Sequence, residues 1–409
     1  IMALEAKLSQ IARLDNKEQT VQLSSLIDEV VAGASIAGLR TIAQKILSDD
    51  VHVQVTKPVL TYLATAVKQL SDDHFYDIAV FLVTCIKQNA SAQSYDEADF
   101  ILRDGLFSYC VGCEEYTEAA QYLAGSNLES TTRVFTDLEK VDIYIKCAEA
   151  VLEVDEAIDA EIYVNKASAL INAAASQSKS GEDAYGPVQL RFRVTYARVL
   201  DANRKFAEAA VRYYGLSTTT GYNVLQEDLL ELLGKAVTCA ILGKAGQQRS
   251  RVLGLLIKDE RLADLDNTAK YTSHRVVLTK MHLEQILKRH ELDLFVQALM
   301  PHQKAVAGDG YSILDKAVME HNLIAIGRIY ENICITEVAT ILGLEPEKAE
   351  KVAAAMITEG RLNACIDQTE GLLIFEGNSD ALESWDRGIE AVCSEITDFV
   401  DNVQMVSTH

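Results

Sequence analysis

The sequence predicts a mainly α-helical protein, in which stacked helix pairs are followed by a small module with a β-hairpin and by a long C-terminal helix. Three observations lead to this fold class. The chain has 409 residues but only four prolines, and each proline stands where a helix can begin or a loop can turn. Apolar residues recur at helical spacing along most of the chain. Strand signals are nearly confined to residues 359 to 375.

The N-terminal region, residues 1 to 225, is predicted to be an arm of tetratricopeptide-like helix pairs. Related segments occur at 76 to 82, 116 to 123 and 206 to 214: YDIAVFL, YTEAAQYL and FAEAAVRYY. Each places an aromatic residue three and four residues before small or β-branched residues, so that alanines leave holes which aromatic side chains fill. The uneven spacing favours stacked helices over a strict repeat family. Pro58 and Pro187 are each expected to begin a helix.

Residues 226 to 325 are predicted to form a second helical subdomain. Its apolar spacing tightens in LLELLGKAVTCAIL, and Ser312 with Asp315 three residues later predicts a capped helix over 312 to 330. Residues 244 to 290 carry ten Lys or Arg against five acids, a net charge of +5. Such a patch is compatible with RNA, with an acidic protein surface or with an ordinary solvated face.

Residues 302 to 310, HQKAVAGDG, are predicted to be an exposed, mobile loop. The segment follows Pro301, contains two glycines and has no apolar periodicity. Two interpretations stay open, a signalling contact with a partner and a simple linker. The candidate signalling residues are His302, Gln303, Lys304, Gly308, Asp309 and Gly310.

Residues 326 to 378 are predicted to form a winged helix. CITEVATILGLEPEKAEKVAAAMIT is typical of two helices, and EGRLNACIDQTEGLLIF of a hairpin closed by Gly371. The region holds four basic against nine acidic residues, a net charge of −5, so contact with protein is favoured over DNA. The outer strand is expected to pair with or be capped by a partner, and the candidate contact residues are Ile366, Leu372 and Ile374.

Residues 379 to 409 predict a partner-binding helix. Asp380 and Glu383 form a start like a capping box, after which apolar residues follow at spacings of three and four with acids between them. The alternative is that the helix packs back on its own domain, above all near Trp385. The stripe consists of Leu382, Trp385, Ile389, Val392, Ile396, Phe399, Val403 and Val406.

Composition and motifs argue against several function classes. With 38 Lys and Arg against 60 Asp and Glu, the net charge is −22, which opposes DNA binding. No apolar run is long enough for a membrane span, and the N-terminus lacks the pattern of a secretory signal, so an intracellular protein is expected. Metal-protease, phosphate-loop, dinucleotide and nucleophile-elbow motifs are missing. We therefore expect no catalytic residues, no metal and no cofactor.

The eight cysteines are expected to be reduced thiols. Only Cys110 and Cys113 lie close together in the sequence, and their C-x-x-C spacing is compatible with half a zinc site or a redox pair. Zinc needs further ligands that do not follow, and Cys110 falls in the apolar pattern of a helix. Packing is therefore the favoured role, with a redox or zinc enzyme as the alternative.

Three stretches closely resemble the PCI-domain scaffold subunits of the COP-nine signalosome: AGQQRSRVLGLLIKDER (245 to 261), LMPHQKA with GDGYSILDKAVMEHNL (299 to 323) and AEKVAAAMITEGRLNACIDQTEG (349 to 371). The resemblance is strong over residues 225 to 378 and looser over the N-terminal helices. It implies that 226 to 325 is the PCI helical subdomain, that 326 to 378 is its winged helix, and that 379 to 409 joins a shared helical bundle.

The resemblance also implies the biological role. The family assembles a complex that removes a ubiquitin-like modifier from cullins, and a different subunit with a JAMM motif carries the isopeptidase. The expected partners are the other signalosome subunits, including that isopeptidase module, and cullin-RING ligases gripped by the N-terminal arm, in cytoplasm and nucleus. The alternative is a PCI subunit of another assembly, such as the proteasome lid or a translation-initiation or messenger-RNA complex, with weak nucleic-acid binding.

Overall fold

The computed structural model of the chain describes residues 7–8, 11, 16–33, 35–48, 52–89, 91–130, 132–177, 185–219, 224–268, 270–306, 310–375, 385 and 388–396. These residues form two compact units, one ending at Asn203 and one beginning at Arg204. Helix α11 therefore belongs to the second unit, whereas the sequence predicted an N-terminal arm that extends to residue 225.

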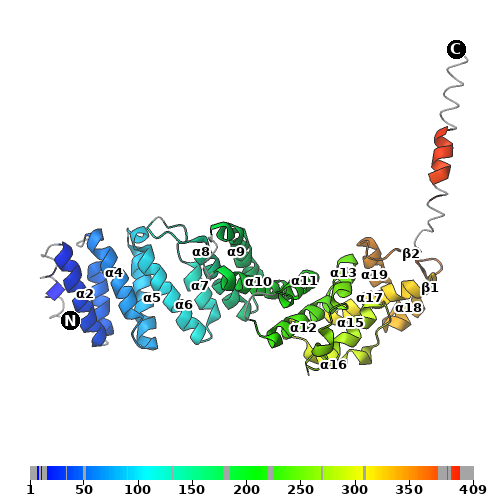
Figure 1. Cartoon of the computed structure of the whole chain (residues 1–409), viewed down its shortest axis with the longest axis horizontal. Helices are drawn as coiled ribbons and strands as arrows, with labels where there is room; N and C mark the ends of the chain where they lie inside the picture. Colours follow the sequence, from blue (N-terminus) through cyan, green and yellow to red (C-terminus); the bar gives the residue numbers. More distant parts are fainter. Residues whose placement is uncertain are drawn as a thin grey trace, which may run out of the picture. The chain divides into compact units, whose positions relative to one another are not determined.

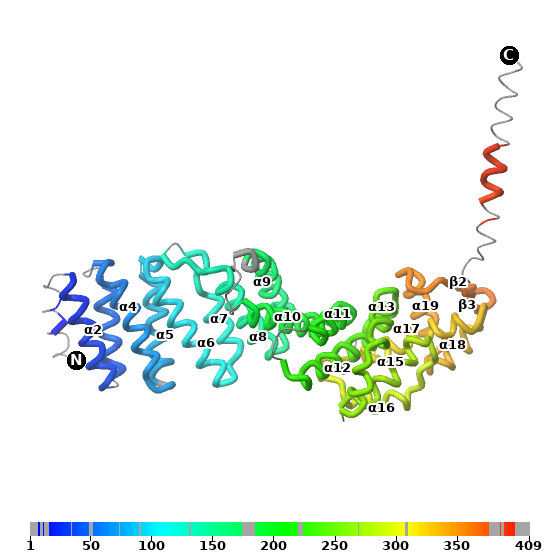
Figure 2. Tube along the Cα trace, in the orientation of Figure 1, coloured from blue at the N-terminus to red at the C-terminus, as the bar shows by residue number. Residues whose placement is uncertain are grey.

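The first unit is a stack of antiparallel helices (Figures 1 and 2). Helices α2 and α4 to α8 follow one another in chain order, and each contacts the next. The helices are α2 (Asn16–Ala32), α3 (Ile36–Ile46), α4 (Val53–Val67), α5 (Asp72–Gln88), α6 (Asp96–Gly112), α7 (Tyr116–Ala124), α8 (Asp137–Glu153), α9 (Ala157–Gln177) and α10 (Tyr185–Ala202), with a 3₁₀ turn η1 (Ala92–Tyr95). The predicted solenoid of helix pairs is confirmed.

Small residues allow these helices to approach one another closely, as predicted. Ala79 of α5 and Ala119 and Ala120 of α7 are buried, and the Tyr76 ring stacks on Tyr109 of α6 with 5.1 Å between ring centroids. The turns that join α6 to α7 and α8 to α9 each contain a non-glycine residue with positive φ, namely Glu114 (64°) and Asp155 (62°). This left-handed residue ends one helix and reverses the chain for the next.

Pro58 does not begin a helix, contrary to the prediction. Helix α4 begins at Val53, where the His52 ring accepts a hydrogen bond from the Gln54 amide (3.3 Å), so Pro58 lies inside the helix. Proline there forfeits one backbone hydrogen bond. The buried face of α4, which includes Val59 and Leu63, offsets that cost.

The second unit contains α11 (Phe206–Ser217), α12 (Gln226–Leu242), α13 (Gln247–Leu256), α14 (Leu262–Leu265), α15 (His274–His282), α16 (Asp293–Ala298), α17 (Ile313–Ile329), α18 (Ile335–Leu342) and α19 (Pro346–Thr358), with 3₁₀ turns η2 (Arg289–Glu291) and η3 (Pro301–Lys304). As predicted, Ser312 caps α17: its hydroxyl accepts from the Asp315 amide (3.1 Å), and the Asp315 carboxylate accepts from the Ser312 amide (3.1 Å).

The winged helix is built on α17. Its three-stranded antiparallel sheet has the order β1-β3-β2, formed by β1 (Asn332–Cys334), β2 (Ala364–Asp367) and β3 (Leu372–Phe375). The core beneath the sheet and α18–α19 includes Leu323 and Ile326 of α17. The predicted division at residue 326 therefore cuts a continuous helix that contributes to the core of the winged helix. The hairpin was predicted, but β1 was not.

Candidate partner-binding surfaces

The winged-helix sheet has two distinct faces, set by the antiparallel register. Ile333 of β1, Leu373 of β3 and Ile366 of β2 form one row across the sheet. Residues directly opposite one another share a face, and Leu373 is buried against the core, with Ile366 packed on the same cluster. The prediction for Ile366 therefore needs correction, because its side chain faces the core and not a partner.

Leu372 and Ile374, the other two predicted hairpin contacts, share the outward face of the sheet. Ile374 lies between Asn332 and Cys365 in the register, and all three side chains are exposed. Both residues stand on β3, the central strand, whose backbone pairs on both sides. In the part of the chain that the structure describes, the open edges are β1 and β2. Backbone pairing with a partner would therefore use β1 or β2, while Leu372 and Ile374 offer side-chain contacts.

Helix α19 takes the position of a recognition helix but carries mixed charge. Lys348 is ion-paired with Glu345 (3.3 Å), and Glu350 accepts a hydrogen bond from Gln368 (2.8 Å). Exposed carboxylates stand beside each lysine on this helix. They would repel the phosphates of a nucleic acid, in line with the predicted preference for protein.

A buried polar junction fixes the winged helix to the helical subdomain. Arg361 donates to the Glu320 carboxylate of α17 (2.6 Å) and to the Ala245 carbonyl (3.3 Å). The same carboxylate accepts from the Ala245 amide (3.0 Å). Both charged side chains are only 15% exposed. Removing Arg361 would leave the Glu320 carboxylate buried without its charge partner, so this pair helps to hold the winged helix on the helical subdomain.

Arg249 and His321 extend this junction into the core. The Arg249 guanidinium donates to the Gly243 carbonyl (3.2 Å) and to His321 Nδ1 (3.4 Å), and His321 Nε2 lies 2.8 Å from the Gln285 carbonyl. Because Arg249 can only donate, Nδ1 must accept and Nε2 carries the proton. Burial, helped by the Arg249 charge, lowers the pKa of His321 to about 4. The histidine is a neutral core residue.

The basic segment of residues 244 to 290 is not one cationic face. Arg249 is buried, Arg261 pairs with Asp259 and Arg275 pairs with Asp266 (2.6 Å and 3.0 Å). Lys280 also pairs with a carboxylate, that of Glu291. Internal ion pairs and burial thus take up several of the charges that an RNA-binding surface would need.

The segment 302 to 310 differs from its prediction as an exposed, mobile loop. Residues 301 to 304 form η3, and the Gln303 side chain is buried and accepts from the Met300 amide (3.1 Å). Val306 then bridges to Ser312. These contacts hold the segment at both ends. Gln303 is therefore not the exposed loop residue that was predicted. His302 is partly buried, and Lys304 and Gly310 are exposed. Gly308 and Asp309 lie outside the described residues.

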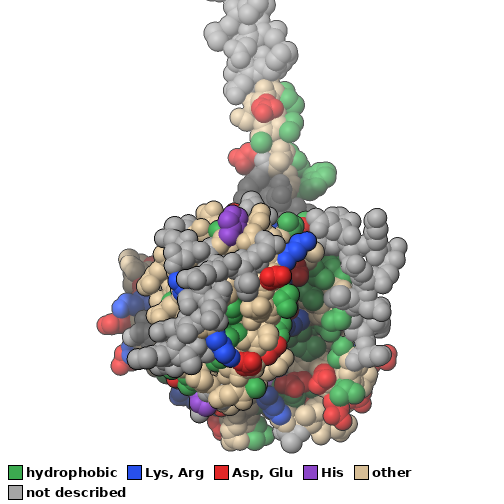
Figure 3. Space-filling view, turned by 90° about the vertical axis from the view of Figure 1, so that its left-hand side faces the viewer, with side chains coloured by type: hydrophobic (Ala, Val, Ile, Leu, Met, Phe, Trp, Pro, Cys, Tyr) green, Lys and Arg blue, Asp and Glu red, His purple; other side chains and the backbone are tan. Residues whose placement is uncertain are grey.

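The described part of the C-terminal helix, residues 388 to 396 with Trp385, exposes its apolar stripe. The exposed fractions are 70% for Trp385, 49% for Ile389, 56% for Val392 and 58% for Ile396. Apolar side chains gather on one side of this stretch in Figure 3. Large apolar side chains exposed in a row mark an interaction surface. Leu382, Phe399, Val403 and Val406 lie outside the described residues.

Cys110 and Cys113 do not form a common site. Cys110 is buried and Cys113 exposed. The one candidate metal cluster among the described residues joins Cys110 to Glu115 and Glu118, with ligand atoms within 4.8 Å of one another. Burial, reinforced by these two carboxylates, raises the pKa of the Cys110 thiol to about 11. The sulfur is therefore a protonated thiol that packs in the core, and a poor ligand or nucleophile.

Comparison with known proteins agrees with this arrangement. The family model described as "PSMD12/CSN4, N-terminal" matches residues 1–225, and the PCI domain model matches residues 272–377. None of the described helices is long and apolar enough to cross a membrane.

Curated relatives cover nearly the whole chain. COP9 signalosome complex subunit 4 of Arabidopsis thaliana is 36% identical over 98% of this chain and 97% of its own length. The proteins of the same name are 35% identical in Drosophila melanogaster, over 95% and 91%, and 33% identical in Dictyostelium discoideum, over 95% and 94%. The alternative of another PCI assembly is therefore not favoured. The chain belongs to the COP9 signalosome subunit 4 family.

Proposed function

We propose that the chain is a non-catalytic scaffold subunit of the signalosome that removes a ubiquitin-like modifier from cullins. In this role it joins the other signalosome subunits, and a separate subunit with a JAMM motif performs the cleavage. The N-terminal helical arm engages cullin-RING ligases, and the complex acts in cytoplasm and nucleus. DNA is not a ligand of the winged helix.

The observation that carries this proposal is the exposed stripe of Trp385, Ile389, Val392 and Ile396. Their spacing of four, three and four residues is that of a helix in a bundle. Burying four such side chains contributes roughly 6–12 kcal/mol before association and ordering costs. That is sufficient to hold a subunit in an assembly, and the outward Leu372 and Ile374 add a second contact.

The test compares two substitutions that add the same charge to opposite faces of this helix. Val392→Asp places a carboxylate in the stripe, whereas Ser394→Asp places it on the polar face. Each variant is expressed with an affinity tag in its own cell, and the recovered subunits are quantified by native mass spectrometry. We expect Val392→Asp to weaken incorporation by about 100-fold or more, because a charge in an apolar interface is left unpaired, and Ser394→Asp to assemble normally.

Two results would contradict the proposal. Full incorporation of a chain ended at residue 378 would show that the C-terminal helix has no bundle role. Cleavage of the cullin modifier by the purified chain alone would show that it is not a scaffold. In assembled samples, the deneddylation rate should fall in proportion to the amount of incorporated subunit.

A further inference from the structure

Helices α7 and α9 of the stack in Figure 1 begin in the same way. Glu114 and Asp155 are the left-handed residues of the turns that precede them. In each turn the following residue, Glu115 or Glu156, donates its amide to a carbonyl five positions earlier, at 2.9 Å and 3.3 Å. Its carbonyl accepts from the amide four positions later, at 3.1 Å and 3.2 Å. The two helices can therefore be compared position by position from the left-handed residue.

The buried positions of the two helices are equivalent. The fifth residue after each left-handed residue is a buried alanine, Ala119 in α7 and Ala160 in α9. The ninth is a buried aliphatic residue, Leu123 in α7 and Val164 in α9. The covered face therefore follows one pattern in both helices.

The exposed positions differ between the two helices. The third and seventh residues after the left-handed residue are Thr117 and Gln121 in α7, and both are exposed. In α9 the same positions hold Ile158 and Ile162, which are 77% and 50% exposed. Because they are four residues apart, the two isoleucines are neighbours on the helix surface. Helix α7 shows that this turn forms without aliphatic side chains there, so the isoleucines form an apolar patch that is available to a partner.

Carboxylates surround this patch. Residues 153 to 162 contain five acids and no Lys or Arg. Two of the acids have partners, since Glu153 pairs with Arg198 (2.8 Å) and Glu161 accepts a hydrogen bond from Asn203 (2.8 Å). The other three are exposed, and within the described part of the chain their side chains form no ion pair or hydrogen bond. These three acids are Asp155, Glu156 and Asp159.

The acids by themselves do not indicate a partner. Helix α7 also begins with acids, Glu115 and Glu118, because carboxylates stabilise the positive N-terminal end of a helix. They do restrict what can cover the isoleucines, since a segment with carboxylates or phosphates of its own would be repelled. Lys166, one turn beyond Ile162, lies over two tyrosine rings, 5.7 Å and 5.9 Å from their centroids. This single cation does not balance three exposed carboxylates.

We propose that the start of α9 docks a basic segment of another protein. An aliphatic side chain of that segment packs on Ile158 and Ile162, and its Lys or Arg side chains meet Asp155, Glu156 and Asp159. A second copy of this chain is a poor occupant, because a symmetric contact would bring the same carboxylates face to face. The inference goes beyond the proposed function, since it assigns residues and a partner chemistry on the arm and depends on no particular partner.

The first experiment identifies the occupant by photo-cross-linking. p-Benzoylphenylalanine replaces Asn165, an exposed residue one turn from Ile162, in the full-length chain, and intact cells are irradiated. Mass spectrometry then locates the cross-linked peptide. We expect a peptide of another protein in which an aliphatic residue is flanked by several Lys or Arg residues. The control carries the same probe at Ala124, the equivalent exposed position of α7, and should not give this product.

The second experiment exchanges the isoleucines for the residues of α7. Ile158→Thr with Ile162→Gln should fold normally, because α7 forms with these residues, and circular dichroism checks this. The yield of the cross-link from position 165 should fall by about 10-fold or more. The matched control, Thr117→Ala with Gln121→Ala in α7, should stay within about 2-fold of the unsubstituted chain.

The third experiment tests the charge of the occupant. Glu156→Gln with Asp159→Asn should lower the cross-link yield by about 3-fold to 10-fold and make it less sensitive to added NaCl in a cell extract. Glu115→Gln with Glu118→Gln in α7 is the control, which should change the yield by less than about 2-fold.

Four results would overturn the inference. They are the absence of any cross-link from position 165, a cross-link within this chain or to a second copy of it, a cross-linked peptide without neighbouring Lys or Arg, and an unchanged yield after the isoleucines are replaced.

Discussion

Helix α12 and the C-terminal helix carry apolar residues at the same helical spacing, yet they differ in what covers them. In α12 every residue from Ala236 to Leu242 is buried, because α11, α13, α15 and α17 pack around it. In the described part of the C-terminal helix, four apolar side chains are about half exposed or more. The comparison shows that apolar periodicity predicts that a face will be covered, without specifying whether the same chain or a partner covers it.

The strongest test of this difference truncates one apolar side chain on each helix. Leu233→Ala in α12 removes a fully buried side chain and should lower the free energy of unfolding by about 2–5 kcal/mol. Val392→Ala, on a side chain 56% exposed, should change the stability of the free chain by less than about 0.5 kcal/mol.

Urea denaturation followed by circular dichroism measures both effects. In assembly assays the larger effect should be that of Val392→Ala, which should weaken incorporation. A folded Leu233→Ala chain should be incorporated normally. Equal loss of stability in the two variants would mean that the C-terminal stripe is covered by its own chain.

The pH dependence of stability gives a second test of the difference between α12 and the C-terminal helix. His274 packs against α12 with its Nε2 3.0 Å from the Thr238 hydroxyl, and burial lowers the pKa of His274 from 6.5 to about 4. The unfolded chain therefore binds the proton more readily between these pH values. Stability should fall as the pH drops from 6.5 towards 4, by up to about 3 kcal/mol from this histidine.

His274→Phe provides the control, because it keeps an aromatic ring beside Tyr271 and Phe295 but removes the titrating group. Its stability should depend less steeply on pH than that of the wild type, as measured by urea denaturation at several pH values. An unchanged slope would show that other groups cause the acid sensitivity. Replacements within the exposed stripe should not alter the slope.

Two glycine substitutions compare a covered helix surface with an open one, and their expected effects on stability are smaller. A Cβ built on Gly327 of α17 would lie 2.8 Å from the Phe375 ring, whereas one on Gly254 of α13 meets its nearest atom at 3.6 Å. Gly327→Ala should therefore cost about 1–3 kcal/mol by pushing Phe375 out of its site. Gly254→Ala should be neutral or stabilise by up to about 1 kcal/mol. Thermal unfolding of both variants checks the difference, and equal melting temperatures would refute it.

Local patterns predicted much of this structure. The alanine-rich helices, the Ser312–Asp315 cap and the hairpin depend on residues within a few positions of one another, so periodicity and turn chemistry were sufficient. The strand β1 is only three residues long, too short for an alternating pattern. The prediction that Pro58 begins a helix was wrong because the tertiary burial of α4 outweighs the local preference of proline.

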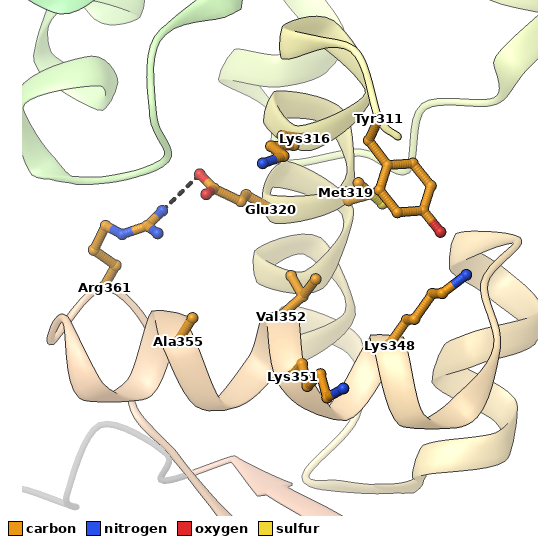
Figure 4. Close-up of a pocket in the computed structure, with 9 residues that line it drawn as sticks. All are labelled: Tyr311, Lys316, Met319, Glu320, Lys348, Lys351, Val352, Ala355 and Arg361. Carbon is orange, nitrogen blue, oxygen red and sulfur yellow. Dashed lines mark hydrogen bonds and ion pairs between the residues drawn. The ribbon is translucent and has the colours of Figure 1, made fainter. Parts of the chain in front are cut away.

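Contacts between distant residues could not be predicted in this way. Arg361 donates to a carbonyl 116 positions away, at Ala245, and no short window contains both residues. Gln303 is polar and stands beside glycine-rich sequence, so its burial depends on the surrounding fold. Ile366 alternates correctly along its strand, but which face is covered follows from the register with β3 and from the position of α17. The groove between α17 and α19, shown in Figure 4, likewise combines residues from two separate helices.

The continuity of α17 has a mechanical consequence. The helix runs unbroken for 17 residues, a rod of about 25 Å, and it contacts α12 as well as contributing to the core under the sheet. A sharp kink in such a rod would disrupt its backbone hydrogen bonds. A load applied to the sheet by a neighbouring molecule would therefore be transmitted to the helical subdomain as a displacement of the whole rod, with little absorbed by flexing.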